Sequence, residues 1–279
     1  MRKKFMGIDA IEVRDPDGAV ALVAVHGAHV LSWTPAGGEP VLYLSDKSQF
    51  GPGSAIRGGV PIIFPQFGER GNGKRHGFAR VQDWNFQSAG IEGGYSVARF
   101  RLAQNALGGD TWQHGFQLDY QISLHAQQLK LKLEACNTSG HPWEFCAALH
   151  TYLRVADVSR VTVTGLHGRP YLDQVAGGMQ CVQEHRELRI EGEIDRIYGG
   201  VTEQLQLDDG VRPLKVDKLG FKDVVVWNPG WEKAASLADM VPSDFATFLC
   251  VEAGAILEPV HLLPGQCWSG EQVITAGAQ

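Results

Sequence analysis

The chain has 279 residues, of which 44% are hydrophobic and 20% are charged. These fractions are typical of folded proteins with a sizeable core, and they exclude wholesale disorder. The formal net charge of −6 at pH 7 gives no general attraction for nucleic acid or for an anionic membrane, because such partners are normally met by a positive field. An anionic ligand therefore has to be held by a local cluster of basic residues.

The cysteines are odd in number, widely spaced and without a CxxC pair: Cys136, Cys146, Cys181, Cys250 and Cys267. This pattern argues against a disulfide framework and against a zinc site, and it favours reduced thiols. The first residues are basic but reach Asp9 before an apolar stretch has formed, so no signal peptide is expected. No apolar run approaches the roughly 18 residues that span a bilayer. We expect a cytoplasmic monomer without nucleic-acid or membrane partners.

The first strand signals, Val20–Val25 and His29–Trp33, are followed by an irregular segment at 51–80 that is too rich in Gly and Pro for a regular strand or helix. Long irregular segments inside compact domains are commonly functional, although a plain surface loop fits the composition equally well. Arg57 and Arg80 lie in this segment, where a close backbone approach and a planar bidentate donor would suit a phosphate or a carboxylate. Exposed arginines are also ordinary.

Strand signals resume at Tyr95–Leu102. The segments Phe116–Leu124 and Leu129–Ala135 then alternate apolar and polar residues, which predicts two half-buried strands joined by a short turn. The next signal, Leu149–Val155, places His150 and Tyr152 on the same, polar face of a strand. A histidine there could look into a cleft and transfer protons near neutrality. A structural or merely exposed histidine is the alternative.

The strand signal at Val161–Val163 leads to a turn-rich stretch containing Asp173, where aspartate is common for backbone reasons alone. Further strands are predicted at Val224–Trp227 and Thr247–Glu252. Glu252 is expected at the end of the last strand, where a carboxylate that emerges from the core could have a raised pKa and act in proton transfer. A solvated glutamate at a strand end is the alternative.

Helical periodicity is scarce, and Trp231–Met240 is the best candidate for a helix. Without an alternation of strands and long helices, a doubly wound parallel sheet is disfavoured. No internal repeat or linker is evident, so residues 1–279 are predicted to form a single all-β domain. The common nucleotide-binding, zinc-protease and nucleophile-elbow motifs are absent from the sequence.

Several motifs, in order along the chain, resemble the aldose 1-epimerase superfamily and, within it, the glucose-6-phosphate 1-epimerase branch: Ile56–Gly68, His76–Arg80, Leu149–Leu153, Asp223–Pro229 and Val251–Gly254. Together with 165–174, the resemblance extends from about residue 26 to residue 268. It implies a large, mostly antiparallel β-sandwich of the galactose mutarotase-like type, with an active site in a concave cleft. The implied activity interconverts the α and β anomers of a hexose 6-phosphate, with D-glucose 6-phosphate as the expected sugar.

The resemblance also implies roles for two residues in proton transfer. His150 corresponds to the general acid that protonates the ring oxygen, and Glu252 to the general base that takes the anomeric hydroxyl proton. Each positioned group of this kind typically contributes about 10²–10⁴-fold to a rate. No metal or other cofactor is implied.

Five further residues match substrate-binding positions of the branch. Arg57 and Arg80 resemble its phosphate-binding arginines, His76 and Asp173 match positions that contact sugar hydroxyls, and Gln66 lies where the branch lines the pocket. The arginine of the His76–Arg80 motif is the feature that favours a phosphorylated sugar over a free one.

The sequence departs from the branch at Ala253, where relatives commonly have proline. Three alternatives stay open. The protein could act on unphosphorylated hexoses, it could be a sugar-binding protein without catalysis on the same fold, or it could be a glycoside hydrolase or lyase that pairs Glu252 with Asp173.

Overall fold

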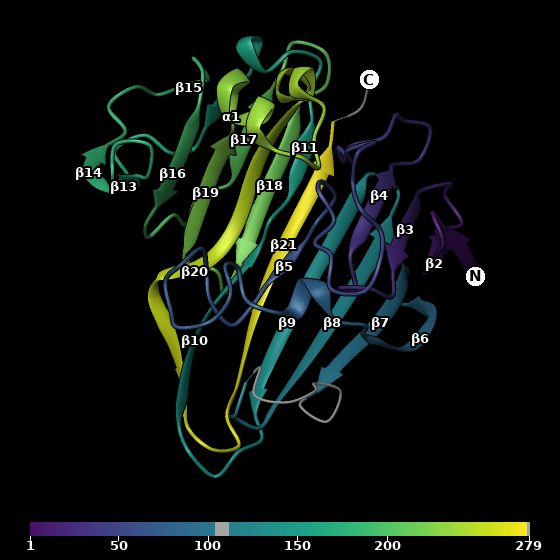
Figure 1. Cartoon of the computed structure of the whole chain (residues 1–279). Helices are drawn as coiled ribbons and strands as arrows, with labels where there is room; N and C mark the ends of the chain where they lie inside the picture. The colour runs from purple at the N-terminus through teal and green to yellow at the C-terminus, as the bar shows by residue number, and fades with distance from the viewer. Residues whose placement is uncertain (104–111, 278–279) are drawn as a thin grey trace.

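A computed structural model describes residues 1–103 and 112–277. Two large antiparallel sheets and a smaller one dominate the molecule (Figure 1). The small sheet has the order β1-β2-β3-β4, formed by Arg2–Phe5, Ile8–Arg14, Val20–Ala24 and Val30–Thr34. The predicted all-β fold with mostly antiparallel strands is confirmed.

The first large sheet has the order β14-β13-β16-β19-β20-β10-β5, with β11 paired to β20 off this path. Its strands are Met179–Val182, Pro170–Asp173, Ile194–Tyr198, Asp223–Asn228, Phe248–Leu262, Trp143–Leu149, Ile62–Ile63 and, for β11, Tyr152–Arg154. We call it the cleft sheet, because it carries the cleft described below.

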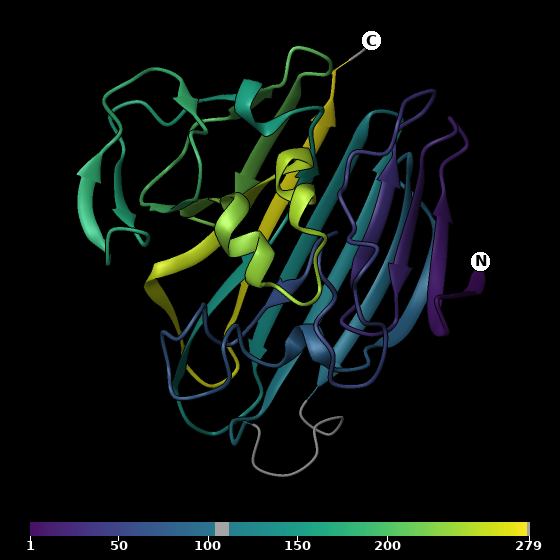
Figure 2. The same ribbon diagram turned by 45° about the horizontal axis from the view of Figure 1, so that its top comes forward.

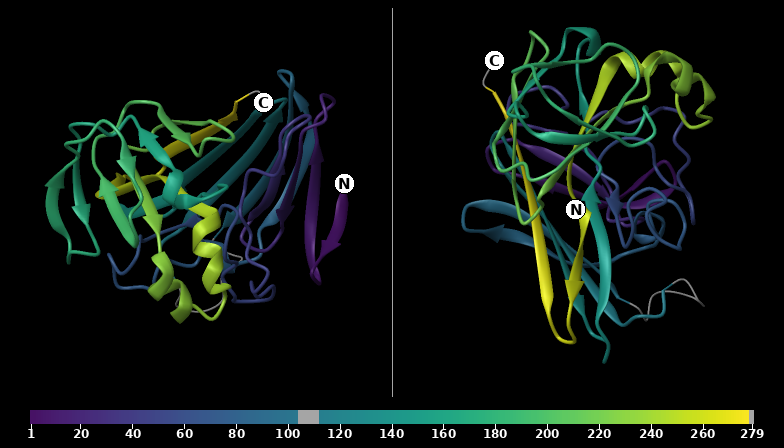
Figure 3. Two further views of the ribbon diagram at one scale, coloured as in Figure 1. Left: turned by 90° about the horizontal axis from the view of Figure 1, so that it is seen from above. Right: turned by 90° about the vertical axis from the view of Figure 1, so that its left-hand side faces the viewer.

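The second large sheet has the order β15-β12-β17-β18-β21-β9-β8-β7-β6. Its strands are Leu188–Arg189, Thr162–Thr164, Leu205–Asp208, Leu214–Leu219, Cys267–Ala276, Gln128–Asn137, Phe116–His125, Tyr95–Ala103 and Asn85–Glu92. The turn between β20 and β21 is one of the connections between the cleft sheet and this sheet (Figure 3). The small sheet and the β13–β14 hairpin lie at opposite ends of the molecule (Figure 2).

The alternating residues of β8 and β9 show how the sequence builds the core. Phe116, Leu118 and Tyr120 point inward from β8, and Leu131 and Leu133 point inward from β9. Each fully buried side chain of this size contributes about 1.5–3 kcal/mol relative to an exposed one. These residues join one large cluster of buried side chains that also draws on the small sheet and the cleft sheet.

Helices are short. The α-helix α1 comprises Gly230–Ser236, so the helix predicted to reach Met240 ends early, at Leu237, whose backbone is extended. In the part of the chain that the structure describes, the 3₁₀-helices η1, η3 and η4 comprise Ala79–Val81, Val158–Arg160 and Pro242–Thr247. Among the described residues, no helix has the length and apolar character to cross a membrane.

Two strand predictions need correction. The expected strand at 149–155 is two strands, β10 and β11, which are separated by His150 and Thr151. At the break, the Thr151 N–H donates to the Leu149 carbonyl, two residues back, at 2.9 Å, and the Thr151 hydroxyl donates to the Gln272 side chain of β21 at 2.6 Å. Glu252 lies well inside β20, which continues to Leu262, and not at a strand end.

The expectation that all cysteines are reduced is wrong for two of them. Cys136 on β9 and Cys267 on β21 are directly opposite each other in the antiparallel register and form a disulfide. The sequence separation of 131 residues hides this pairing, because only the strand register brings the two residues together. Cys146, Cys181 and Cys250 are free.

Candidate active site

A cleft of about 740 Å³ lies on the cleft sheet. Its floor includes side chains of β11, β16, β19 and β20, namely Tyr152, Asp195, Val225, Trp227 and Glu252. The irregular segment 51–80 and the segment around α1 supply further lining residues: Ala55, Ile56, Arg57, Pro61, Phe67, Gly68, Glu69, Arg70, Arg75, His76, Arg80, Lys233, Leu237 and Asp239. The segment 51–80 has little regular structure, as predicted, and lines the cleft.

His150 and Glu252 meet in this cleft. Nδ1 of His150 lies 3.2 Å from Oε1 of Glu252, and both side chains are almost fully buried. The orientation is not that of a hydrogen bond, so His150 Nδ1 and Glu252 Oε2 have no hydrogen-bond partner among the described residues. Buried polar atoms without partners are costly and rare in folded proteins. They are suited to a ligand that supplies the missing partners.

Burial changes the protonation of this pair. It lowers the pKa of His150 well below its ordinary value, and the neighbouring His76 and arginines act in the same direction. It raises the pKa of Glu252 well above its ordinary value; the nearby Asp195 adds to this, and Arg80 opposes it. Both shifts favour the uncharged forms. Moving the carboxyl proton of Glu252 to His150 would leave Glu252 as the acceptor and His150 as the donor, which is what concerted acid–base catalysis requires.

His76 is fixed in one tautomer by the backbone. The Gly68 N–H donates to Nδ1 of His76 at 3.2 Å, so Nδ1 is the acceptor and Nε2 carries the proton. Burial, reinforced by Arg80, lowers the pKa of His76 to about 3. His76 therefore stays neutral at physiological pH. Its backbone lies at φ +62°, an uncommon conformation for a residue other than glycine, of the kind that clusters at functional sites.

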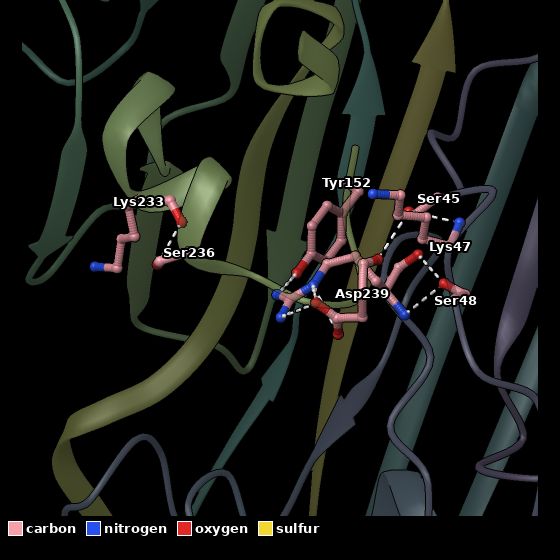
Figure 4. Close-up of polar contacts among 8 residues, drawn as sticks. Ser45, Lys47, Ser48, Tyr152, Lys233, Ser236 and Asp239 are labelled. Carbon is pink, nitrogen blue, oxygen red and sulfur yellow. Dashed lines mark hydrogen bonds and ion pairs between the residues drawn. The ribbon is translucent and has the colours of Figure 1, made fainter. Parts of the chain in front are cut away.

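Arg57 is held in place by two neighbours. Its Nε donates to both carboxylate oxygens of Asp239 at 3.2 Å, and Nη1 donates to the Tyr152 hydroxyl at 3.0 Å. Ser45 in turn donates to the Asp239 carbonyl, and Figure 4 shows Tyr152, Asp239 and Ser45 grouped at this point. A guanidinium has five N–H donors, so Arg57 retains donors for a ligand.

Arg80 adds a second cation to the cleft. Its Nη2 donates to the Arg75 carbonyl at 3.1 Å, and its buried Nε has no partner among the described residues. Burial, together with Arg57 and Arg75, lowers the pKa of Arg80 to about 10, because these like charges are crowded in a partly dry site. An anion would relieve this repulsion. This is the local basic cluster that an anionic ligand of an acidic chain requires.

Gln66 and Asp173 are not among the residues that line the cleft. Gln66 is buried and ties the irregular segment together, since its amide bonds the backbone of Gly68 and Gly73. Asp173 ends β13 and accepts a hydrogen bond from the Ala176 N–H, and it lies 3.5 Å from Arg196. The structure thus brings five of the seven predicted site residues together at the cleft.

Sequence reasoning missed Asp195 and Asp239 as cleft residues. Burial raises the pKa of Asp195 to about 6. The signal for Asp195 is an acidic residue in the short apolar pattern of Ile194–Tyr198, which becomes β16. Asp239 has no comparable signal, because its place beside Arg57, 182 residues away in sequence, depends on the fold.

Comparison with known proteins places the chain in a family. Residues 9–275 match the family described as aldose 1-epimerase. A protein of Cenchrus ciliaris is 32% identical over 97% of this chain and 85% of its own length, and a protein of Escherichia coli K12 is 34% identical over 94% and 90%. Both are named "Putative glucose-6-phosphate 1-epimerase". The chain belongs to the aldose 1-epimerase family.

Solved structures agree with this assignment. A crystal structure described as "a putative mutarotase (YeaD) from Salmonella typhimurium" has a TM-score of 0.90 and 30% identity, and the match covers all of this chain and 93% of the other. A galactose mutarotase related enzyme from Lactobacillus acidophilus has a TM-score of 0.74 at 13% identity, over 96% and 97% of the two chains. The second likeness shows the fold alone. The fold is therefore the predicted galactose mutarotase-like β-sandwich.

Proposed function

We propose that this epimerase interconverts the α and β anomers of a hexose 6-phosphate, with D-glucose 6-phosphate as its substrate. The observation that carries the proposal is the buried pair of His150 and Glu252, with unpaired polar atoms, in a cleft that also contains Arg57 and Arg80. The names of the curated relatives support the choice of sugar.

In the proposed reaction, the shared proton first moves from Glu252 to His150. Glu252 then accepts the proton of the anomeric hydroxyl while His150 donates a proton to the ring oxygen. The bond between C1 and the ring oxygen breaks, and C1 becomes an aldehyde. Rotation about the C1–C2 bond presents the other face of the carbonyl, and the reverse proton transfers close the ring. The proton gained by Glu252 and the one lost by His150 are exchanged back at closure, so the enzyme ends each cycle unchanged.

The remaining cleft residues would hold the substrate. Arg57 and Arg80 would bind the phosphate, because planar guanidinium groups match phosphate oxygens. His76 would donate its Nε2 proton to a sugar hydroxyl oxygen, which its fixed tautomer allows. We retain Gln66 and Asp173 in this proposal as residues that support the site from outside its lining.

The test is anomer exchange measured by NMR on purified protein, with glucose 6-phosphate, glucose and galactose compared against the uncatalysed background. The proposal predicts fast exchange with the phosphate ester alone. Fast exchange with the free sugars would instead favour an epimerase of unphosphorylated hexoses. No exchange with any of the three would favour a sugar-binding protein.

A further inference from the structure

Cys250 lies next to the His150–Glu252 pair, yet the proposed reaction does not use it. Cys250 and Glu252 are two residues apart on β20, so their side chains share one face of the strand. The Cys250 sulfur, a ring nitrogen of His150 and a carboxylate oxygen of Glu252 all lie within 4.8 Å of one another. All three residues are buried.

A second observation shows that this cluster is suited to a ligand. His150 Nδ1 and Glu252 Oε2 are buried and lack hydrogen-bond partners among the described residues, although both residues line the cleft. Each can supply a lone pair to a cation that enters from the cleft. The adjacent thiol adds a soft ligand, which favours zinc over magnesium or calcium.

We propose that His150, Cys250 and Glu252 form a binding site for Zn²⁺ at the floor of the cleft. Zinc bonds of about 2.3 Å to sulfur and 2.0–2.2 Å to nitrogen or oxygen place tetrahedral ligands about 3.6 Å apart. Atoms separated by at most 4.8 Å therefore need to approach by about 1 Å. Three protein ligands leave one position for water or a sugar oxygen.

Zinc in this site would act as an inhibitor. The cation would occupy the lone pairs of His150 and Glu252, which are the atoms that exchange protons with the sugar in the proposed mechanism. This effect on activity rests on the proposed function. The binding site itself rests only on the geometry of the three side chains, so the two can be tested separately.

Binding is tested on the full chain with Co²⁺ as a spectroscopic substitute and with buffered Zn²⁺ in calorimetry. The expected result is a thiolate-to-cobalt absorption band that is lost in Cys250→Ala. Partners outside the ligand set already contribute about 10–100-fold to metal affinity, so loss of this ligand should weaken Zn²⁺ binding by at least about 10-fold. Cys146→Ala is the matched control, because it also removes a buried free thiol, and Cys181→Ala controls for the more accessible thiol.

Inhibition is tested by titrating free Zn²⁺ during anomer exchange, with each variant compared with its own metal-free rate. The wild type should lose activity and regain it with a chelator, whereas Cys250→Ala should need at least about 10-fold more zinc. Equal zinc affinity in the wild type and Cys250→Ala would overturn the site. If the protein catalyses no exchange, the proposed function fails, and the cobalt spectrum still decides whether the site exists.

Discussion

His150 stacks face to face on Tyr152, with ring centroids 4.8 Å apart and an angle of 8° between the planes. The same Tyr152 accepts a hydrogen bond from Arg57 through its hydroxyl. Tyr152 therefore supports both His150, the proposed acid, and Arg57, a proposed phosphate ligand. Its ring and its hydroxyl can be tested by separate substitutions.

Tyr152→Phe keeps the ring and removes the hydroxyl. We expect KM for glucose 6-phosphate to rise a few-fold with little change in kcat, because a hydrogen bond of this kind contributes on the order of 1 kcal/mol. Tyr152→Leu removes the stacked ring and should lower kcat, since the orientation of His150 loosens. Saturation kinetics on both variants check this. A larger KM effect in Tyr152→Leu without any loss of kcat would contradict the role of the stacked ring.

His150→Asn and Glu252→Gln should each lower catalysed exchange by about 10²–10⁴-fold while leaving the fold intact. The controls are His141→Asn and Glu258→Gln, which change exposed residues of the same types. NMR exchange rates and circular dichroism are measured on all four variants. Near-normal rates in either cleft variant would remove the proposed mechanism.

Arg80→Ala should raise KM for glucose 6-phosphate much more than it lowers kcat at saturation, because the arginine is proposed to bind a part of the substrate that does not react. Inhibition by inorganic phosphate should weaken in parallel. Arg189→Ala is the control, since Arg189 is exposed and does not line the cleft. An unchanged KM would tell against Arg80 as a phosphate ligand.

His29 should make the protein sensitive to acid. It is fully buried, its Nε2 lies 2.8 Å from the Gly58 carbonyl, and burial lowers its pKa to about 3. Below about pH 6.5, His29 therefore binds a proton in the unfolded state but stays neutral in the folded state. The free energy of unfolding decreases as the pH falls from about 6.5 towards 3. The loss from this one group approaches about 1.4 kcal/mol per pH unit.

The measurement compares the wild type with His29→Gln, in which the amide can still donate to the Gly58 carbonyl. Urea unfolding between pH 6 and pH 4 gives the slope of stability against pH for each protein. The wild type should have the steeper slope, and the difference isolates His29 from the other buried groups. Equal slopes would contradict the prediction.

Gly77→Ala should destabilise the protein more than Gly94→Ala. Both glycines have positive φ, +68° and +84°, and alanine in that region costs about 1–2 kcal/mol. A Cβ at Gly77 would lie 2.0 Å from the Phe64 carbonyl oxygen, whereas one at Gly94 meets nothing within 4 Å. Overpacking should add about 1–3 kcal/mol at Gly77. Chemical denaturation of the two variants provides the check, and equal losses would show that the segment yields to the added methyl group.

Strands could be predicted from the sequence where one face of the strand is buried. Residues 116–124 and 129–135 alternate without interruption, and β8 and β9 include both segments. The continuous strand expected at 149–155 is broken at Thr151, whose N–H bonds the Leu149 carbonyl and whose hydroxyl bonds Gln272, a residue far away in the chain. Local pattern cannot contain such a contact.

The candidate site divides in the same way. His150 and Glu252 could be found because short motifs mark them, and the structure brings them together. Asp239 could not be found, because only the fold brings it next to Arg57, which is distant in sequence. The pairing of Cys136 with Cys267 was hidden for the same reason, since it is a matter of register between β9 and β21.

The β20–β21 hairpin has a consequence for how the chain is made. β20 pairs with β19 and β10 in the cleft sheet, and β21 pairs with β18 and β9 in the other large sheet. During synthesis, both sheets stay split until this late hairpin leaves the ribosome, and the strands beside each gap keep open edges that can pair with other chains. The nascent protein therefore depends on the β20–β21 hairpin both to complete its two large sheets and to supply Glu252.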